Sequence, residues 1–141
     1  MLPFIGYNVG QYFTHWLNMG KRFKLAPKIF HVNWFRTNQE GKFIWPGFGE
    51  NLRVLDWILK RVEGNAGAQK TAIGFIPHVQ DINCDGLDIS EDSLNQLLSV
   101  DKSDWMHELE NQDEFLNKIG DDLPAEIRNQ HSQLKELLQK L

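Results

Sequence analysis

A cluster of aromatic and glycine residues between Asn33 and Asn51, reading NWFRTNQEGKFIWPGFGEN, has the residue types of a pocket for a flat heterocycle. Its aromatic members are Trp34, Phe35, Phe43, Trp45 and Phe48. Gly47 and Gly49 flank Phe48, and because glycine tolerates positive φ angles, this ring can be presented from a tight loop. Stacking on aromatic side chains stabilises a bound base by about 1–3 kcal/mol, but it does not tell one base from another.

Discrimination between bases needs hydrogen bonds, and Asn51 at the end of the cluster carries both a donor and an acceptor. A buried polar group that the wrong base leaves without a partner costs about 1–3 kcal/mol. A second interpretation stays open at this point. Aromatic residues at alternating strand positions are usually core residues, and Asn51 would suit the N-cap of a helix that follows it.

Neither a phosphate cradle nor a catalytic group of residues accompanies this cluster. The pairs Gly20-Lys21 and Gly41-Lys42 lack the preceding glycine and the following Ser or Thr that complete a P-loop. The histidines are scattered without H-x-x-x-H spacing or a cysteine partner, so no zinc site is predicted. No serine lies in a nucleophile elbow. We therefore expect no catalytic residue and no metal ligand in this chain.

The stretch from Asp81 to Asp92 partly matches a calcium-binding EF-hand loop, because it begins with the pattern D-x-N-x-D-G. The last position of the loop is Asp92 instead of the bidentate glutamate, and Pro77 interrupts the segment where an EF-hand has a helix. A turn rich in Asp and Asn residues is the better interpretation.

Composition predicts a globular protein of one unit, residues 1–141, because 41% of the residues are hydrophobic and 24% are charged. The net charge of −4 provides no basic field for a phosphate backbone, which argues against nucleic acid as a partner. The single cysteine, Cys84, fits a reducing cytoplasm. Apolar runs are far shorter than the ~20 residues that span a bilayer, so no membrane partner is expected.

Hydrophobic periodicity predicts a mixed α/β fold, with short strands and helices early and a helical tail from about residue 90 to 141. Helices are expected over 10–19, over 51–62, from Ser90 to about Val100, from Asp101 or Ser103 to about Ile119, and from Pro124 to the end. Strands are expected over 28–35, 42–45 and 71–76, the last of them buried. The segment Pro46–Gly49 between them is expected to be a loop.

Three segments together resemble the C-terminal part of GTP-dependent phosphoenolpyruvate carboxykinase. They read PFIGYNVGQYFTHWLNMGK, LAPKIFHVNWFRTNQEGKFIWPGFGENLRVLDWILKRVEG and IGFIPHVQDINCDGLDIS. The resemblance runs in register from the first residues to the helical tail, and WPGFGEN within NWFR…GKF is highly specific for this family.

The resemblance implies a role in the interconversion of oxaloacetate and GTP with phosphoenolpyruvate, GDP and carbon dioxide, a decarboxylating phosphoryl transfer of gluconeogenesis that uses Mn²⁺ and Mg²⁺. In the family the guanine of GTP or GDP lies among three Phe and an Asn on this segment. The matching positions are Phe35, Phe43, Phe48 and Asn51. The guanine-binding segment would therefore be 33–51.

The resemblance also implies that the chain is part of a larger enzyme's nucleotide-binding lobe. The family's P-loop, manganese ligands, substrate-binding arginines and mobile lid precede the matching region. We therefore expect about a quarter of the enzyme, packing on the N-terminal part and unable to turn over alone. Two alternatives remain: a stand-alone, non-catalytic module that binds a nucleotide or a partner, and a purely structural helical docking domain.

Overall fold

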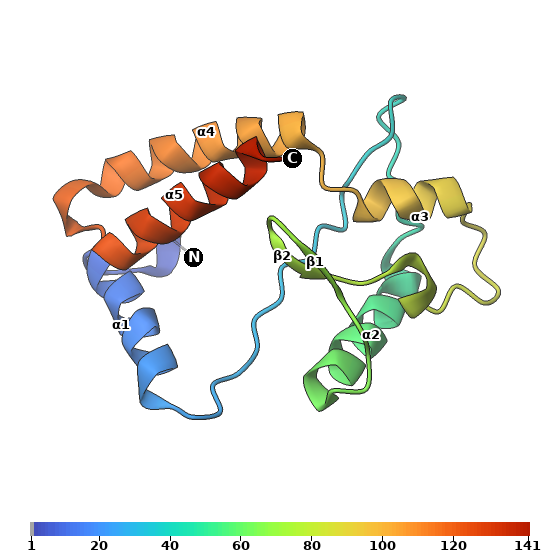
Figure 1. The fold of residues 1–141 in the computed structure, drawn as a ribbon, viewed down its shortest axis with the longest axis horizontal. Coiled ribbons are helices and arrows are strands. Elements are labelled where there is room, and N and C mark those ends of the chain that lie inside the picture. Colours follow the sequence, from blue (N-terminus) through green and yellow to red (C-terminus); the bar gives the residue numbers. More distant parts are fainter. Residues whose placement is uncertain (1) are drawn as a thin grey trace. The chain divides into compact units, whose positions relative to one another are not determined.

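The computed structural model describes residues 2–141 and divides them into two compact units. Unit 1 combines the segment that ends at Pro27 with Asp101–Leu141, and unit 2 is Lys28–Val100. Figure 1 colours the elements of both units along the chain. That the whole of 1–141 forms one domain stays a prediction.

Unit 1 is helical. It contains the 3₁₀ turn η1 (Leu2–Phe4), α1 (Val9–Arg22), α4 (Lys102–Ile119), the 3₁₀ turn η4 (Gly120–Asp122) and α5 (Ala125–Gln139). Helices α4 and α5 lie side by side, joined by the short η4 turn (Figure 1). Leu109, Leu123 and Leu138 are buried in this unit. Burying such side chains removes apolar surface from water and is the main force that holds the helices together.

The start of α1 is held against η4 by one asparagine and one glycine. Asn8 caps the helix, since its Oδ1 accepts hydrogen bonds from Gly10 N at 2.7 Å and Gln11 N at 3.2 Å. Its Nδ2 donates to Asp122 Oδ2 at 2.6 Å. A Cβ at Gly10 would lie 2.0 Å from the backbone oxygen of Asp122, so only glycine allows this close approach.

Unit 2 is mixed. It contains the 3₁₀ turn η2 (Phe48–Glu50), α2 (Asn51–Glu63), β1 (Gln69–Thr71), β2 (Gly74–Ile76), the 3₁₀ turn η3 (Val79–Asp81) and α3 (Glu91–Leu98). The two strands form an antiparallel hairpin in which Gln69 pairs with Ile76. The buried apolar residues of the unit are Trp45, Trp57, Ile82 and Leu94. The mixed α/β class with a helical C-terminal stretch is therefore confirmed.

The five predicted helices are all present, with changed ends. The first helix continues past its predicted end at residue 19 to Arg22, and α2 ends at Glu63, where Gly64 adopts the left-handed conformation at φ +81. Ser90 Oγ accepts from Ser93 N at 3.1 Å and caps α3. Asp101, rather than Ser103, caps α4. Of residues 2–141, no helix has both the length and the apolar character needed to cross a bilayer.

The predicted strands are largely wrong. Residues 28–35 form no strand, and Asn33 Oδ1 accepts from Phe35 N at 2.9 Å, which diverts a backbone donor from any sheet ladder. Residues 42–45 contribute only an isolated bridge between Thr37 and Phe43. Residues 71–76 do not form one buried strand: they contain the end of β1, the turn and β2, and all of them are half-buried or exposed. Gly74, at φ +120, allows the chain to reverse there.

Candidate functional site

The predicted aromatic site divides into exposed and buried rings. Phe35, Phe43 and Phe48 are 71%, 63% and 92% exposed, whereas Trp45 is only 6% exposed. The core interpretation is therefore wrong for the three phenylalanines and correct for Trp45. Phe35 and Phe43 pack edge to face, with ring centroids 5.8 Å apart at 63°. Two neighbouring rings that stay open to solvent form an apolar face on which a flat ligand can be placed.

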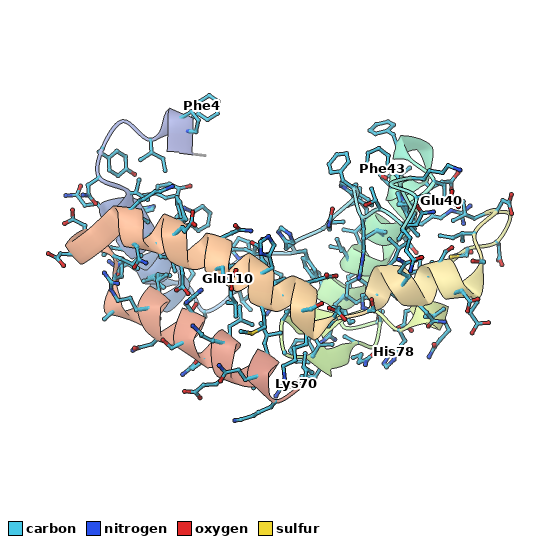
Figure 2. The ribbon with its side chains drawn as sticks, turned by 90° about the horizontal axis from the view of Figure 1, so that it is seen from above. Phe4, Glu40, Phe43, Lys70, His78 and Glu110 are labelled. Carbon is cyan, nitrogen blue, oxygen red and sulfur yellow. The ribbon has the colours of Figure 1, made fainter. Side chains whose placement is uncertain are left out.

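A tight polar turn brings Phe35 and Phe43 together. Asn38 Oδ1 accepts hydrogen bonds from Glu40 N and Lys42 N, both at 3.0 Å, and Asn38 N donates to Lys42 O at 2.9 Å. An antiparallel bridge pairs Thr37 with Phe43, and this places Phe43 beside the chain segment that carries Phe35 two residues earlier. Figure 2 labels Glu40 and Phe43 on this turn, where the side chains project away from the ribbon.

Arg36 anchors the chain beside Phe35 to the end of α3. Its guanidinium donates to Ser99 O and Ser99 Oγ, each at 3.0 Å, and to Leu97 O at 3.3 Å. A fork of several donors holds a backbone segment more firmly than a single ammonium could. The segment that carries Phe35 is thereby fixed, although it belongs to no regular strand.

Phe48 is presented by the loop that leads into α2. Gly47 has φ +125 and ψ −171, a conformation that L side chains rarely adopt. The predicted loop is confirmed at Pro46 and Gly47, while Phe48 and Gly49 belong to the 3₁₀ turn η2. The ring of Phe48 is left as the most exposed of the three phenylalanines.

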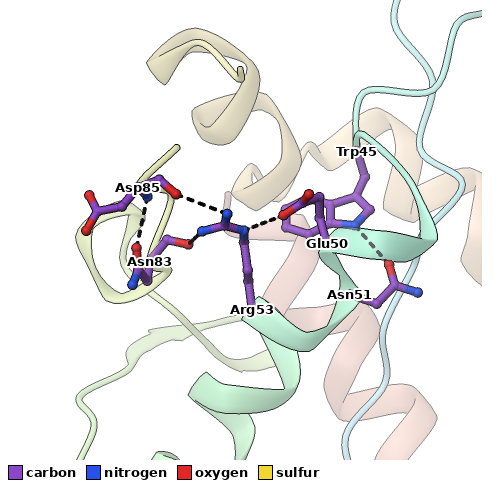
Figure 3. Close-up of polar contacts among 6 residues, drawn as sticks. All are labelled: Trp45, Glu50, Asn51, Arg53, Asn83 and Asp85. Carbon is purple, nitrogen blue, oxygen red and sulfur yellow. Dashed lines mark hydrogen bonds and ion pairs between the residues drawn. The ribbon is translucent and has the colours of Figure 1, made fainter. Parts of the chain in front are cut away.

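Asn51 is the first residue of α2 and not its N-cap. The cap position is taken by Glu50, whose side chain makes no capping bond. Instead, Asn51 Oδ1 accepts from Trp45 Nε1 at 3.0 Å (Figure 3). Because an indole nitrogen can only donate, this bond identifies which end of the amide faces Trp45. Within residues 2–141, Asn51 Nδ2 has no acceptor, so two donor hydrogens remain for a ligand.

Sequence reasoning missed Arg53, which holds the corner between η2 and α2. Its Nε donates to Glu50 Oε2 at 2.5 Å, Nη1 to Asn83 O at 2.7 Å and Nη2 to Asp85 O at 3.0 Å (Figure 3). The i, i+3 spacing of Glu50 and Arg53 is a sequence signal for the first contact. No local pattern indicates the other two, because they join residues about thirty positions apart.

The acidic turn that Arg53 contacts is an Asx turn. Asn83 Oδ1 accepts from Asp85 N at 2.9 Å, which confirms the interpretation made from the sequence. Among residues 2–141, no group of three or more His, Cys, Asp or Glu side chains is placed to hold a metal ion. No chemical step through a metal is therefore assigned to the described residues.

A separate hollow of about 390 Å³ lies between α4 and α5 in unit 1. Phe115, Leu116, Ile127, His131 and Leu134 contribute to its lining, and none of the predicted site residues does. The Nε2 atom of His131 is buried there without a hydrogen-bond partner among the described residues, while Nδ1 lies 3.5 Å from Asp113 Oδ1.

Comparison with known proteins connects these residues to a family. The family model described as the phosphoenolpyruvate carboxykinase C-terminal P-loop domain matches residues 1–137. The chain belongs to the GTP-dependent phosphoenolpyruvate carboxykinase family.

Several bacterial carboxykinases are close in sequence, each with the name phosphoenolpyruvate carboxykinase [GTP]. The protein of Anaeromyxobacter sp. (strain K) is 47% identical over 136 residues, which cover 96% of this chain and 23% of that relative. The proteins of Corynebacterium jeikeium (strain K411) and Chlamydia pneumoniae are 44% and 45% identical, covering 96% and 99% of this chain and 23% and 24% of their own lengths. The chain thus spans about a quarter of the carboxykinases it matches.

The described residues thus offer exposed phenylalanine rings and an amide donor on one segment of a carboxykinase chain. The roles of Phe35, Phe43, Phe48 and Asn51 in binding guanine remain predictions. All four lie in unit 2, on a continuous stretch of chain between Phe35 and Asn51.

Proposed function

We propose that this chain supplies the guanine-binding end of a GTP-dependent phosphoenolpyruvate carboxykinase. The proposal rests on the exposure of Phe35, Phe43 and Phe48 on the segment that ends in Asn51. The family match of the chain supports it. In the reaction proposed for the whole enzyme, oxaloacetate and GTP give phosphoenolpyruvate, GDP and carbon dioxide. This is a cytoplasmic step of gluconeogenesis, and Mn²⁺ and Mg²⁺ are held by residues outside this chain.

Stacking on the phenylalanines would provide most of the base affinity. Each stacked base contributes about 1–3 kcal/mol, and exposed rings lose unfavourable water contact when a purine covers them. Asn51 would supply the selectivity. Its Nδ2 can donate to O6 of guanine, whereas adenine presents an amine donor at the same position of the ring.

An exposed apolar stripe on α2 supports the proposal that the chain packs on the remaining part of a longer carboxykinase. The stripe consists of Leu52, Leu55, Leu59 and Val62, each at least 42% exposed. Their intervals of three, four and three residues place them along one side of the helix. An apolar patch of this kind marks a protein interface, and the matched relatives are about four times longer than this chain.

The binding proposal is tested by titrating the 141-residue chain with GDP and with ADP, followed by calorimetry or NMR. GDP should bind weakly, because base contacts without a phosphate grip leave little free energy beyond the cost of association. It should nevertheless bind better than ADP.

In the same titration, Phe48→Ala should weaken GDP binding about 5- to 150-fold, the equivalent of losing one stacking contact. The matched control is Phe75→Ala, which removes another exposed ring of unit 2 from the strand β2. If both variants lost the same amount of GDP affinity, the stacking role proposed for Phe48 would be wrong.

A stand-alone binding module is the second candidate, and the exposure of the three phenylalanines fits it as well. The two candidates differ in the GDP affinity of the 141 residues alone: a self-sufficient module should bind GDP tightly, whereas a base site without a phosphate grip should bind it weakly. Neither candidate predicts turnover by this chain. We expect no phosphoenolpyruvate from oxaloacetate and GTP with the 141 residues alone. Turnover by this chain would contradict the proposal that the catalytic residues lie elsewhere.

A further inference from the structure

We propose that Trp45 determines the base preference of the site by holding the Asn51 amide in one orientation. This inference rests on the proposed function. Trp45 would be a positioning residue, since its ring is buried and acts through Asn51 rather than through contact with the base. The argument depends on the donor-only character of an indole nitrogen.

The contact between Trp45 and Asn51 allows only one orientation of the amide. Trp45 is 6% exposed, and its Nε1 hydrogen points at Asn51 Oδ1 over 3.0 Å (Figure 3). If the amide turned over, Nδ2 would face Nε1, and two donors would meet without an acceptor. A buried donor that loses its partner is costly, so the amide stays with Nδ2 directed away from Trp45.

Neither partner of this bond is free to move away. Trp45 packs against Trp34, with ring centroids 6.1 Å apart. Asn51 has helical φ and ψ angles of −60 and −29 at the first position of α2. The turn just before it is fixed through Glu50 by Arg53, which also holds the backbone of the Asn83–Asp85 turn.

The fixed orientation of the Asn51 amide favours guanine over adenine. An outward Nδ2 can donate to O6 of guanine, while the N6 amine of adenine would place donor against donor. Without the indole N–H, the amide could turn Oδ1 outward and accept from adenine. Loss of Trp45 Nε1 should therefore weaken GDP binding and strengthen ADP binding at the same time.

The test is Trp45→Phe in the 141-residue chain, with GDP and ADP affinities measured by NMR titration. We expect the ratio of the two affinities to fall about tenfold, the equivalent of one hydrogen bond. Trp34→Phe is the matched control, because it makes the same change in the neighbouring ring and leaves the Asn51 bond intact. Its ratio should equal that of the wild type.

A second variant tests the orientation without touching the core. In Asn51→Asp, one carboxylate oxygen can keep the bond to Trp45 Nε1, and the outward group becomes an acceptor. The preference should then shift toward ADP, and any repulsion of the phosphates should affect both nucleotides alike.

The outcomes separate the inference from the proposed function. A wild-type chain that does not prefer GDP would remove the guanine site and the role of Trp45 together. A guanine-selective wild type whose preference survives Trp45→Phe would overturn only the role of Trp45. If that variant does not fold, a preference that survives Asn51→Asp would overturn both the selectivity assigned to Asn51 and the role of Trp45, and would leave the stacking on the phenylalanines in place.

Discussion

The solvent exposure of large apolar side chains differs between two regions, the helix pair α4–α5 and the segment from Phe35 to Val62. In the helix pair, Leu109 and Leu138 are almost completely buried, at 1% and 0% exposure. In the other segment, three phenylalanines and the stripe on α2 remain open to solvent. Apolar surface left exposed in a folded unit is evidence of a ligand or a partner. The comparison therefore separates residues that hold the fold from residues available for binding.

The largest effect on stability is expected from a buried leucine of the helix pair α4–α5. Leu138→Ala should lower the free energy of unfolding by about 2–5 kcal/mol, because it leaves a cavity between helices. Leu137→Ala, at a neighbouring position that is 48% exposed, is the control and should cost much less. Urea unfolding followed by circular dichroism measures both. Similar losses in the two variants would contradict the packing of α5.

A pair of glycines in α1 tests the close approach to η4. Gly10→Ala should cost about 1–3 kcal/mol, because the new methyl group would overlap the Asp122 carbonyl. Gly20→Ala should instead stabilise the chain by about 0.5–1 kcal/mol, since nothing lies within 4 Å and alanine favours a helix. Thermal unfolding should thus shift in opposite directions, and a common direction would argue against this contact.

A substitution of Arg53 tests whether its hydrogen bonds stabilise the segment that carries the exposed phenylalanines. Arg53→Lys should cost about 1–2 kcal/mol, because an ammonium cannot reproduce the bonds to Glu50, Asn83 and Asp85 together. Arg22→Lys changes an exposed arginine at the end of α1 and serves as the control. Urea unfolding of both variants should separate them, and equal midpoints would show that the three bonds contribute little.

The smallest effect is expected on the α2 stripe. Leu59→Gln should change the stability of the 141-residue chain by no more than about 0.5 kcal/mol, since the side chain is 62% exposed. The same urea measurement applies. A loss as large as that of Leu138→Ala would show that the stripe is already covered, and the proposed packing on the rest of the enzyme would lose its support.

Local patterns predicted the helices well. All five have an apolar period, and two of them also begin at a predicted capping residue, Ser90 before α3 and Asp101 before α4. The strands were predicted poorly because a strand needs a partner, and β-branched residues alone do not supply one. Residues 28–35 have the composition of a strand, yet they remain outside any sheet.

The candidate site was predicted in its residue types and not in its geometry. Phe35, Phe43, Phe48 and Asn51 were chosen on residue types and family resemblance, whereas their exposure could not be read from the sequence. The contact between Trp45 and Asn51 was also missed. It depends on the path of the loop at Gly47 and on burial of the indole, which are set by the packing of unit 2.

By itself the sequence determined which segments form helices and which family the chain belongs to, because these depend on neighbouring residues and on motifs such as WPGFGEN. Only the tertiary structure decided which aromatic rings are buried, which end of the Asn51 amide is available, and which residues Arg53 joins. The physical reason is that burial and hydrogen-bond partnership depend on residues distant along the chain. A local sequence pattern does not indicate which distant residues will become neighbours in the folded chain.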